Sequence, residues 1–521
     1  MVSHELAFTA LLVTLVLILI SWYKSDETSN SRKAGTPPLP PGPKGLPLVG
    51  SLPFLGPNIH EELTNISHQY GPIFKLYLGS KLHIVVNSAE MAKVITVEQD
   101  ESFANRAPHI AGLATSYGGN DIAFAPNNAN RRNLRKVLVQ EVLSNVNLEA
   151  SHAYRRHEVR KAVKYVYDRV GMDVDINEIS FSTVLNVLTN IIWRKGFVDD
   201  GTNYANLSEK IQKVICRIVE IAEGLNISDF FPMIARFDLQ GVERKMKDQM
   251  KQFDKIIETT IKERMNSKST NVEETVEQKG RKDFLQILLE HTDQKTGTSI
   301  TMTQLKALVS DIFLGGTDAT SAMVEWAMTE IFRDQKVMKR VQDELEEIVG
   351  LNNIVEESHI PKLKYLEAVC KETFRLHPPI PFLLPRAPNK PCTVGGYTVP
   401  EGATIFVNVW AIQRDPRHWE DPSEFNPDRF LNCNGSTEKW DYSGTNLTFL
   451  PFGSGRRRCP GIPLGEKMMM HILASLMHSF DWKLPNGEEL DLSERFGIAL
   501  KKKKPLVAVP TKRLSDPSLY M

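Results

Sequence analysis

The chain has 521 residues, of which 41% are hydrophobic and 24% charged, which is ordinary for a globular protein. Lys+Arg and Asp+Glu both number 63, so the net charge is zero, and this balance argues against a general nucleic-acid-binding protein. Five cysteines with no C-x-x-C pair do not make a disulfide framework, and the odd count predicts a reducing compartment with one thiol kept for another purpose.

The first predicted element is an apolar helix from Leu6 to Tyr23, which contains no charged residue, Pro or Gly. A run of this length reaches about 27 Å as a helix, enough to cross a thin bilayer. Aromatic residues end the run and basic residues from Lys24 onward follow it, so the remaining chain is expected to face the cytosol. A cleaved signal peptide is disfavoured because the positive charge lies on the wrong side. We therefore expect residues 1–24 to form a transmembrane anchor.

Residues 25–44 are predicted to be a polar linker ending in a proline-rich hinge. Five prolines stand in the eight residues from Thr36 to Pro43, a composition typical of a stiff, extended spacer. Residues 45–521 show no repeat and no convincing linker, so they are interpreted as one large domain.

Periodicity predicts that this domain is mainly α with minor β. Residues 73–86 alternate as two short strands around Gly79 and Ser80, which indicates a hairpin. Residues 140–265 are helical in pattern, residues 266–282 are polar and predicted to be an exposed loop, and helices resume at Asp283. A second set of short strands is expected at 382–409.

A long central helix is predicted from Thr303 to Phe332, with Gly315 and Gly316 in its middle. Glycine inside a helix costs about 1 kcal/mol. Tight packing against another helix would explain the pair. Alternatively, a ligand lies against the bare backbone, and a local widening of the helix frees backbone groups to hold water. Asp318, an acid in an otherwise apolar run, favours the second interpretation.

Glu372 and Arg375 are three residues apart, so they share one face of a predicted helix. Most such pairs are exposed and contribute about 0–1 kcal/mol. If the pair is buried instead, it requires further partners to complete its hydrogen bonds.

Residues 451–461 form a glycine-rich loop, PFGSGRRRCPG, in front of a helix predicted from Ile462 to Phe480. Cys459 therefore lies where free backbone N–H groups and the helix dipole lower a thiol pKa and favour metal binding. A single soft ligand suits a haem whose opposite face is free. Phe452 could cover the sulfur, and Arg457 could reach an anionic group on the ligand.

Three other interpretations of this loop were weighed. A lone buried cysteine is often only a small apolar residue. The three arginines could form a surface patch, and the glycines a phosphate loop, although the G-K-[ST] ending of such a loop is missing. The complete spacing F-x-x-G-x-R-x-C-x-G favours the haem interpretation, since five fixed positions in ten rarely match by chance.

With these motifs, the chain resembles the cytochrome P-450 family of haem-thiolate monooxygenases from its apolar start to its carboxyl terminus. The segments PPLPPGP, FNPDRF and ERFGIALKKKKPLVAVP are similar to those of plant microsomal A-type members. The resemblance implies a single large, mainly α domain with an amino-terminal transmembrane anchor. It implies haem b as the cofactor, with Cys459 as the metal ligand. It also implies that Arg429 is the third partner of Glu372 and Arg375 in a structural core.

The resemblance further implies which residues hold the haem: Cys459, Phe452, Arg457, Arg135 and Arg386. The family's W-x-x-x-R motif aligns with Arg131-x-x-x-Arg135, so Arg131 replaces its Trp. Arg131 could donate a charge-assisted hydrogen bond to a propionate, and a solvated surface position is the alternative.

Asp318 and Thr320 are the catalytic residues that the resemblance implies, in the segment that activates oxygen. Asp318 matches the acid that supplies protons. The hydroxyl residue that usually follows it is Ala319 here. A substrate hydroxyl, ordered water or Thr320 would then substitute, or else the enzyme rearranges its substrate without activating oxygen. We favour retained oxygenation because Asp318 is intact.

The resemblance implies a substrate pocket lined by five regions, which are mostly apolar and so predict a lipophilic substrate. They are 101–125, Asn226 to Leu239, Phe313 to Gly316, Ile380 to Leu384, and Phe496 to Ile498.

The expected function is NADPH-dependent hydroxylation of a small lipophilic plant specialised metabolite, a terpenoid or a flavonoid or other phenolic. The partners implied are dioxygen, the bilayer and an NADPH–cytochrome reductase, and no nucleic acid is expected to bind. The reductase is expected to be a separate protein because no nucleotide-binding glycine fingerprint is present in the sequence. The expected location is the endoplasmic reticulum membrane, single-pass, with the catalytic domain in the cytosol. The alternatives are a haem-thiolate isomerase or dehydratase, and a haem-binding protein without turnover.

Overall fold

The computed structural model describes residues 37–193, 201–267, 284–291, 299–432, 440–497 and 499–521. The predicted anchor at 1–24 lies outside these residues, as does nearly all of the polar loop predicted at 266–282. Within the described ranges, no helix combines the length and the apolar character needed to cross a bilayer.

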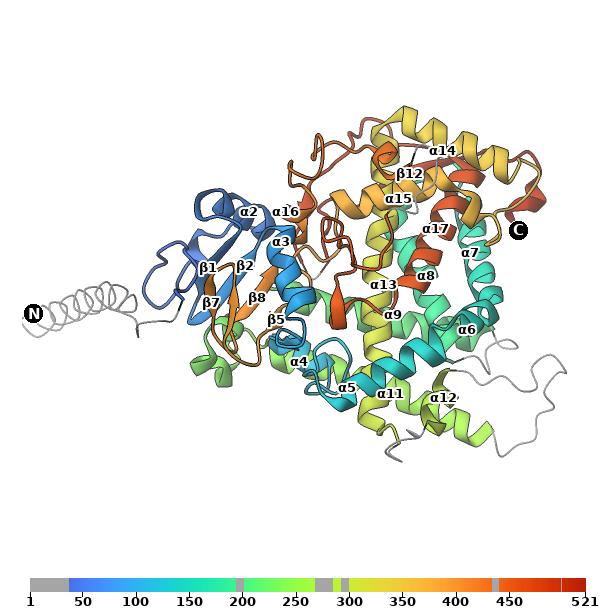
Figure 1. Ribbon diagram of the computed structural model, residues 1–521. Helices are drawn as coiled ribbons and strands as arrows, with labels where there is room; N and C mark the ends of the chain where they lie inside the picture. The colour runs from blue at the N-terminus through green and yellow to red at the C-terminus, as the bar shows by residue number, and fades with distance from the viewer. Residues whose placement is uncertain (1–36, 194–200, 268–283, 292–298, 433–439, 498) are drawn as a thin grey trace, which may run out of the picture.

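Helices form most of the molecule. Most of the labelled strands gather at one end, close to where the described chain begins, whereas the strand Val507–Lys512 lies at the other end (Figure 1). The α-helices are α2 (Ile59–Tyr70), α3 (Ala89–Lys93), α4 (Ile110–Thr115), α5 (Ala129–Val137), α6 (Asn145–Ala150), α7 (His152–Tyr167), α8 (Ile176–Ile192), α9 (Gly201–Glu223), α10 (Ile227–Phe230), α11 (Val242–Ser267), α12 (Phe284–Glu290), α13 (Met302–Arg333), α14 (Gln335–Ile348), α15 (Lys364–Leu376), α16 (Val409–Ile412) and α17 (Ile462–Ser479). The predicted mainly α architecture is confirmed.

The long central helix was predicted within a residue of its observed bounds, and α13 runs through the middle of the helical body (Figure 1). Thr301 and Gln304 begin it with a capping box, in which each side chain accepts from the other's backbone N–H. The helix packs against α8, α15 and α17. Its α-helical hydrogen bonding is unbroken past the two glycines, so the expected local widening is wrong. The glycine at 316 packs against Leu188 of α8, which supports the interpretation of tight packing at that position.

The strands form a five-stranded sheet in the order β1-β2-β8-β5-β3 and three smaller sheets. Their bounds are β1 (Ile73–Leu78), β2 (Lys81–Val86), β3 (Asn105–Arg106), β4 (Val174–Asp175), β5 (Arg386–Ala387), β6 (Cys392–Val394), β7 (Tyr397–Val399), β8 (Thr404–Val407), β9 (Phe480–Lys483), β10 (Glu494–Arg495), β11 (Lys501–Lys502) and β12 (Val507–Lys512).

Both predicted groups of strands are confirmed. In the hairpin, Ile73 pairs with Val86 and Leu78 with Lys81. Gly79 turns the chain with φ +58°, and a Cβ there would lie 2.5 Å from the carbonyl oxygen of Phe230, so a larger residue has no room. The strands β5 to β8 fall within the region 382–409.

The described part of the proline-rich segment is bound to the strand end of the molecule. The hydroxyl of Thr398 donates to the carbonyl oxygen of Pro37 at 2.6 Å, and its backbone N–H donates to that of Pro38 at 2.7 Å. The N–H of Lys75 donates to the oxygen of Pro41 at 2.8 Å. The segment therefore lies along β7 and β1 as the chain enters the folded body.

The pair on α15 is fully buried and has the third partner that was expected. Arg375 donates two hydrogen bonds to the Glu372 carboxylate, at 2.6 and 2.8 Å, and Arg429 donates a third at 3.0 Å. Arg375 also donates to the backbone oxygens of Gln413 and Pro422. Because every charge has a partner, this network fixes the segment that leads into the cysteine loop.

Candidate functional site

A cavity of about 390 Å³ lies beside α13, and its wall brings together segments that are far apart in sequence. The cysteine loop and the start of α17 form one part of the wall. The middle of α13, residues of α8 and α9, and the segment from Arg106 to Phe124 form the rest. All eight residues named from the sequence as catalytic or haem-binding line this cavity: Cys459, Arg131, Arg135, Arg386, Phe452, Arg457, Asp318 and Thr320.

Cys459 lies at the end of the glycine-rich loop, two residues before the cap of α17. Gly453 and Gly455 both adopt positive φ, and the loop folds back so that the N–H of Cys459 donates to the oxygen of Phe452 at 3.0 Å. The N–H groups of Gly461 and Ile462 lower the pKa of the thiol, as expected, but burial is the larger effect and raises the pKa overall. The helix start therefore lowers the thiol pKa as predicted, but its effect is smaller than that of burial, which the sequence reasoning did not include.

The arginines on the cavity wall are more numerous than the sequence motifs indicated. Arg106 lies in the region 101–125 that was expected to line the pocket, but its charge was not predicted because it belongs to no recognised motif. It is half-buried and donates to the oxygens of Ala123 and Leu384. Arg131 is 3% exposed, so the alternative of a solvated surface residue is wrong. Together with Arg135, Arg386 and Arg457, these residues concentrate positive charge at the cavity.

This positive charge is incompletely balanced by carboxylates. Burial and mutual repulsion lower the pKa of Arg457 to about 9 and that of Arg131 to about 10. Arg386 donates to Asp100 at 2.9 Å, but its Nε has no hydrogen-bond partner among the described residues. A buried, partly unpaired guanidinium requires an anion, so this wall suits a ligand with acidic groups.

The observed partners of Arg457 are backbone oxygens, whereas the sequence predicted that it reaches an anionic group on the ligand. Its three guanidinium nitrogens donate to the backbone oxygens of Ala104, Ile122 and Ala125, the first at 2.6 Å. Arg131 similarly donates to the oxygen of Arg456 at 2.8 Å. Both side chains therefore hold the 104–125 segment against the cysteine loop while they also face the cavity.

Asp318 connects the cavity to a chain of charged groups from three other elements. It forms a 2.6 Å ion pair with Lys501 of β11, and Lys501 also pairs with Glu223 at the end of α9 at 3.0 Å. Glu223 in turn pairs with Arg495 of β10, which is half exposed. Burial raises the pKa of Asp318, and the ammonium group of Lys501 opposes that increase.

Thr320 and Ala319 both face the cavity, one turn beyond the paired glycines. The hydroxyl of Thr320 donates to the backbone oxygen of Gly316 at 2.8 Å. This bond occupies the proton of the hydroxyl but leaves its oxygen as an acceptor. Thr320 therefore supplies the side-chain hydroxyl that lies next to Ala319 on the cavity wall.

The observed wall confirms three of the five regions expected to line the pocket and changes the other two. The segment 226–239 lies against the hairpin instead, where Ser80 donates to the oxygen of Phe230 at 3.0 Å. In the expected region Phe496 to Ile498, Phe496 packs instead against the rings of His60 and Phe382, and Ile498 lies outside the described residues. The neighbouring Ala499 lines the wall. Among the lining residues that were missed are Val184, Val187, Leu188, Ile191 and Ile192 of α8, Ile218, Val219 and Ala222 of α9, and Asp311 of α13.

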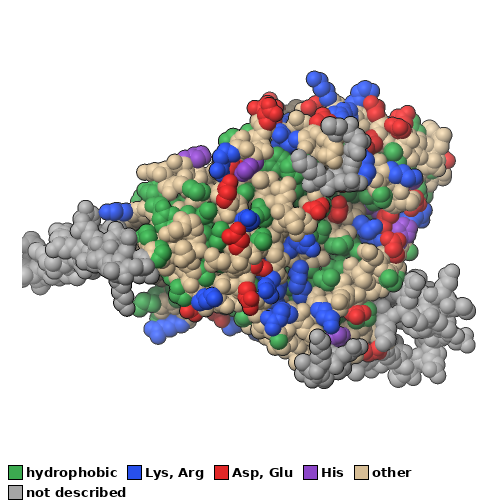
Figure 2. Space-filling view, viewed as in Figure 1, with side chains coloured by type: hydrophobic (Ala, Val, Ile, Leu, Met, Phe, Trp, Pro, Cys, Tyr) green, Lys and Arg blue, Asp and Glu red, His purple; other side chains and the backbone are tan. Residues whose placement is uncertain are grey.

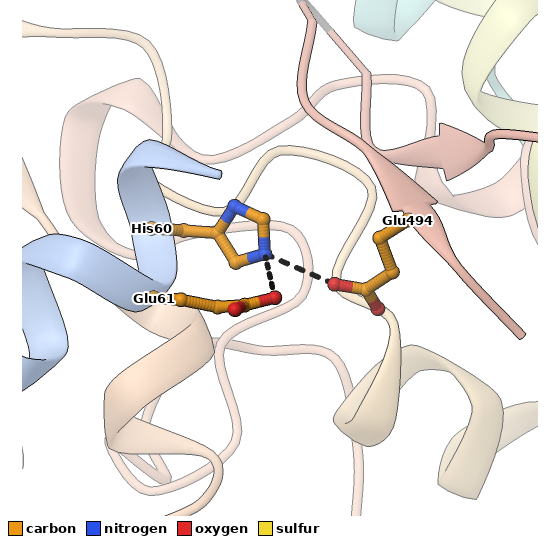
Figure 3. A group of neighbouring side chains, drawn as sticks. All are labelled: His60, Glu61 and Glu494. Carbon is orange, nitrogen blue, oxygen red and sulfur yellow. Dashed lines mark hydrogen bonds and ion pairs between the residues drawn. The ribbon is translucent and has the colours of Figure 1, made fainter. Parts of the chain in front are cut away.

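A second group of ionisable side chains lies outside the cavity, where α2 meets β10 (Figure 3). His60 Nε2 is 3.0 Å from Glu494 and 3.8 Å from Glu61, close enough for all three to ligate a metal ion. However, Glu494 also accepts from His377 at 2.8 Å, and His377 pairs with Glu330 at 2.8 Å. These hydrogen bonds account for the arrangement, so we interpret the group as a structural network joining α2, α13, α15 and β10.

Comparisons with known proteins agree with this site. The family model described as cytochrome P-450 matches residues 40–509. The chain is 37% identical to a flavonoid 3',5'-hydroxylase of Solanum melongena, covering 92% of this chain and 91% of that one. It is 36% identical to a geraniol 8-hydroxylase of Catharanthus roseus, covering 96% and 99%. A zebrafish cytochrome P-450 solved with abiraterone has a TM-score of 0.71 and 26% identity, covering 87% and 99%.

Proposed function

This chain belongs to the cytochrome P-450 family and is a monooxygenase, and on that premise we propose that it uses NADPH to hydroxylate a small lipophilic plant specialised metabolite, a terpenoid or a flavonoid or other phenolic. The observation that carries the proposal is that Cys459 and a cluster of buried arginines share one cavity with the bare backbone of α13. Relatives named for a flavonoid and for a terpenoid are almost equally similar to it, so both classes stay within the proposal.

The family's fold implies a haem whose iron is bound by a cysteine thiolate. The donors at the cavity fit such a group, because one sulfur stands beside guanidinium groups that are suited to propionates. In our proposal Cys459 is the iron ligand, and Arg131, Arg135 and Arg386 bind the propionates. Phe452 and Arg457 shape the proximal wall. When bound, this group supplies the chemistry that inserts one oxygen atom of dioxygen into a C–H bond.

We assign proton supply to Asp318 and Thr320. Asp318 lies between the cavity and the exposed end of its ion-pair chain, so a proton can pass inward from solvent through its carboxyl group. Burial keeps the carboxyl pKa above its usual value, which makes protonation less costly than for an exposed acid. The Thr320 hydroxyl donates to the backbone oxygen of Gly316, so its oxygen is left to accept a hydrogen bond from water or substrate in the cavity.

We propose that electrons reach the protein from a separate NADPH–cytochrome reductase. The sequence offers no glycine fingerprint for a nucleotide, which supports a separate partner.

We also propose that the protein resides in the endoplasmic reticulum membrane through a single anchor at 1–24, with its catalytic domain in the cytosol. Exposed apolar side chains support this location, because they gather near the point where the described chain begins (Figure 2). They lie in two segments flanking the β1–β2 turn: Leu46, Leu48 and Phe54 in one, and Leu225, Met233, Phe237 and Leu239 in the other. Such a surface suits a lipid interface.

The experiment that tests the function is reconstitution of the purified full chain with haem, a plant NADPH–cytochrome reductase and panels of terpenoids and flavonoids. We expect NADPH-dependent product carrying one atom of label from ¹⁸O₂, detected by mass spectrometry. Product formed without NADPH and without label would favour the isomerase or dehydratase, the alternative that Ala319 raises. A substrate-induced change in the haem spectrum with no oxygen uptake would favour a haem-binding protein without turnover.

A further inference from the structure

Lys501 has a flexible side chain, so its place beside Asp318 has to be set by the surrounding fold. Its ammonium group contacts carboxylates on two different helices, Asp318 of α13 at 2.6 Å and Glu223 of α9 at 3.0 Å. A lysine carries its charge on a four-carbon stem and loses much rotamer freedom when it is fixed. How its charge is divided between the two carboxylates therefore depends on where the backbone of this lysine lies.

The backbone immediately before Lys501 is bound from two sides. The N–H of Leu500 donates to the oxygen of Pro379 at 2.8 Å, and the indole N–H of Trp326 donates to the oxygen of Leu500 at 3.3 Å. Leu500 and Trp326 are fully buried, so water does not readily replace the indole bond. The oxygen of Leu500 and the N–H of Lys501 belong to one planar peptide unit. The indole therefore limits rotation of the unit from which the Lys501 side chain starts.

Trp326 is itself held in one orientation by His377. The imidazole stacks on the indole, with the ring centres 3.8 Å apart and the planes 6° apart. Each nitrogen of His377 lies 2.8 Å from a carboxylate oxygen, one of Glu330 and the other of Glu494. Because both edges of the imidazole have partners, the indole lies against a fixed surface. The network around Glu494 thus extends, through two stacked rings, to the peptide before Lys501.

Trp326 also contacts the residue that follows Lys501. Side chains alternate along a strand, so Lys501 and Lys502 of β11 point in opposite directions. The ammonium group of Lys502 lies 5.0 Å from the centre of the Trp326 ring, a cation–π contact, whereas that of Lys501 reaches Asp318. In the neighbouring strand, Glu494 stands opposite Lys502. Contacts at residues 500 and 502 therefore hold the strand on both sides of the lysine that pairs with Asp318.

We propose that Trp326 is a positioning residue, which places Lys501 against Asp318 by holding the backbone of Leu500. The proposal rests on the proposed function and deepens it, because Asp318 is the proton donor in that function. Trp326 is not among the described residues that line the cavity, so it acts on the donor through Lys501 and without touching a substrate. Loss of the indole bond should therefore have the same kind of effect as loss of the lysine.

The test follows the ionisation of Asp318 in the resting, haem-loaded full chain. Its carboxylic-acid C=O band in the infrared spectrum is identified by its loss in Asp318→Asn, and the pH at which half of the band has disappeared is measured. Burial raises the pKa of Asp318, and Lys501 lowers it. Glu223 adds to the first effect and Arg495 to the second. A lysine that moves away lowers the pKa less, so we expect this midpoint to lie at higher pH in Trp326→Phe than in the wild-type protein.

A double variant separates positioning from general loosening of the fold. If Trp326 acts through Lys501, adding Trp326→Phe to Lys501→Met should not move the midpoint further, because the displaced group is already absent. Trp482→Phe is the matched control. Trp482 of β9 is also buried and donates to the oxygen of Leu476 at 3.1 Å, so its loss should lower stability without moving the midpoint. An unchanged midpoint in Trp326→Phe, a further shift in the double variant, or an equal shift in the control overturns the proposal.

A closer substitute covers the case in which Trp326→Phe does not load haem. Benzothienylalanine in place of Trp326 keeps the shape of the indole and exchanges its N–H for sulfur, so it removes only the hydrogen bond to Leu500. The midpoint should again move to higher pH, and an unchanged midpoint contradicts the proposal. None of these measurements requires turnover. Absence of NADPH-dependent product with the reductase would instead sink the proposed function, and the infrared midpoints would still decide what places Lys501.

Discussion

Lys501 Nζ lies 2.6 Å from the Asp318 carboxylate, and this ion pair joins the β10–β11 sheet to the middle of the central helix α13. The pair is mostly buried, and the same lysine contacts Glu223, so one ammonium group sets the charge around the proposed proton donor.

The first prediction concerns Lys501→Met. Burial raises the pKa of Asp318 and Lys501 lowers it, so removing the lysine raises that pKa further. Asp318 then ionises only at higher pH. The negative charge of Glu223 also raises the pKa of Asp318, and the positive charge of Arg495 lowers it. Because the proposed role of Asp318 requires the protonated carboxyl, we expect the alkaline limb of the kcat–pH profile to move to higher pH. Lys503→Met, at an exposed neighbouring position, should leave the profile unchanged.

The second prediction concerns the iron ligand. Cys459→Ala should abolish the absorbance band that a thiolate-bound haem gives with carbon monoxide, because no sulfur would then face the cavity from this loop. Cys370→Ala is the matched control. Its sulfur is buried against Met470 at 3.3 Å and does not belong to the cavity wall, so it does not bind a group held there. An intact band in Cys459→Ala would refute the assignment.

The third prediction concerns Ala319→Thr. The new hydroxyl would face the cavity beside Asp318, and we expect less NADPH to be consumed for each product molecule formed. The ratio is measured by absorbance of NADPH against product quantified by mass spectrometry. If the ratio does not change, Thr320 and water already perform this step, and Thr320→Val should then impair it.

The fourth prediction concerns the buried network on α15. Glu372→Ala leaves Arg375 and Arg429 without their shared carboxylate, and a buried charge that loses its partner costs about 3–5 kcal/mol. We expect a large loss of folded, haem-loaded protein and a lower urea midpoint. Asp343→Asn breaks an exposed pair with Lys339 and should change stability by no more than about 0.5 kcal/mol. Equal stability of the two variants would contradict this assignment.

The fifth prediction concerns acid stability. Hydrogen bonds from His377 and His60 hold the pKa of Glu494 below its usual value despite burial. The stabilisation is therefore fully present above pH 4.5 and is lost as the pH falls toward the lowered value. Glu494→Gln should lower the free energy of unfolding at pH 7 but make it less sensitive to acid between pH 6 and pH 3. A wild-type protein no more acid-sensitive than this variant would argue against the network.

The sequence predicted the elements that depend on local patterns. The central helix, the hairpin and the cysteine loop each have a periodicity or turn residue that specifies them, and the Glu372–Arg375 spacing identified a true buried pair. The eight proposed site residues converge on one cavity because they lie in motifs of a family with one fold.

Contacts between residues far apart in the chain could not be predicted from local sequence patterns. Arg106 belongs to no motif, and its role depends on a loop that folds over it. Lys501 stands among four lysines in sequence, and only the pairing of β10 with β11 brings it to Asp318. Asp311 carried a usable signal, since a residue seven before Asp318 lies on the same helix face.

The bonds from Thr398 and Lys75 to the proline-rich segment have a practical consequence. They secure the chain just after residue 36, so the body cannot swivel about this hinge without breaking them. A truncated protein that begins at residue 37 keeps these contacts. A protein that begins at residue 42 loses all of them, including the hydrogen bond to β1 at the edge of the five-stranded sheet.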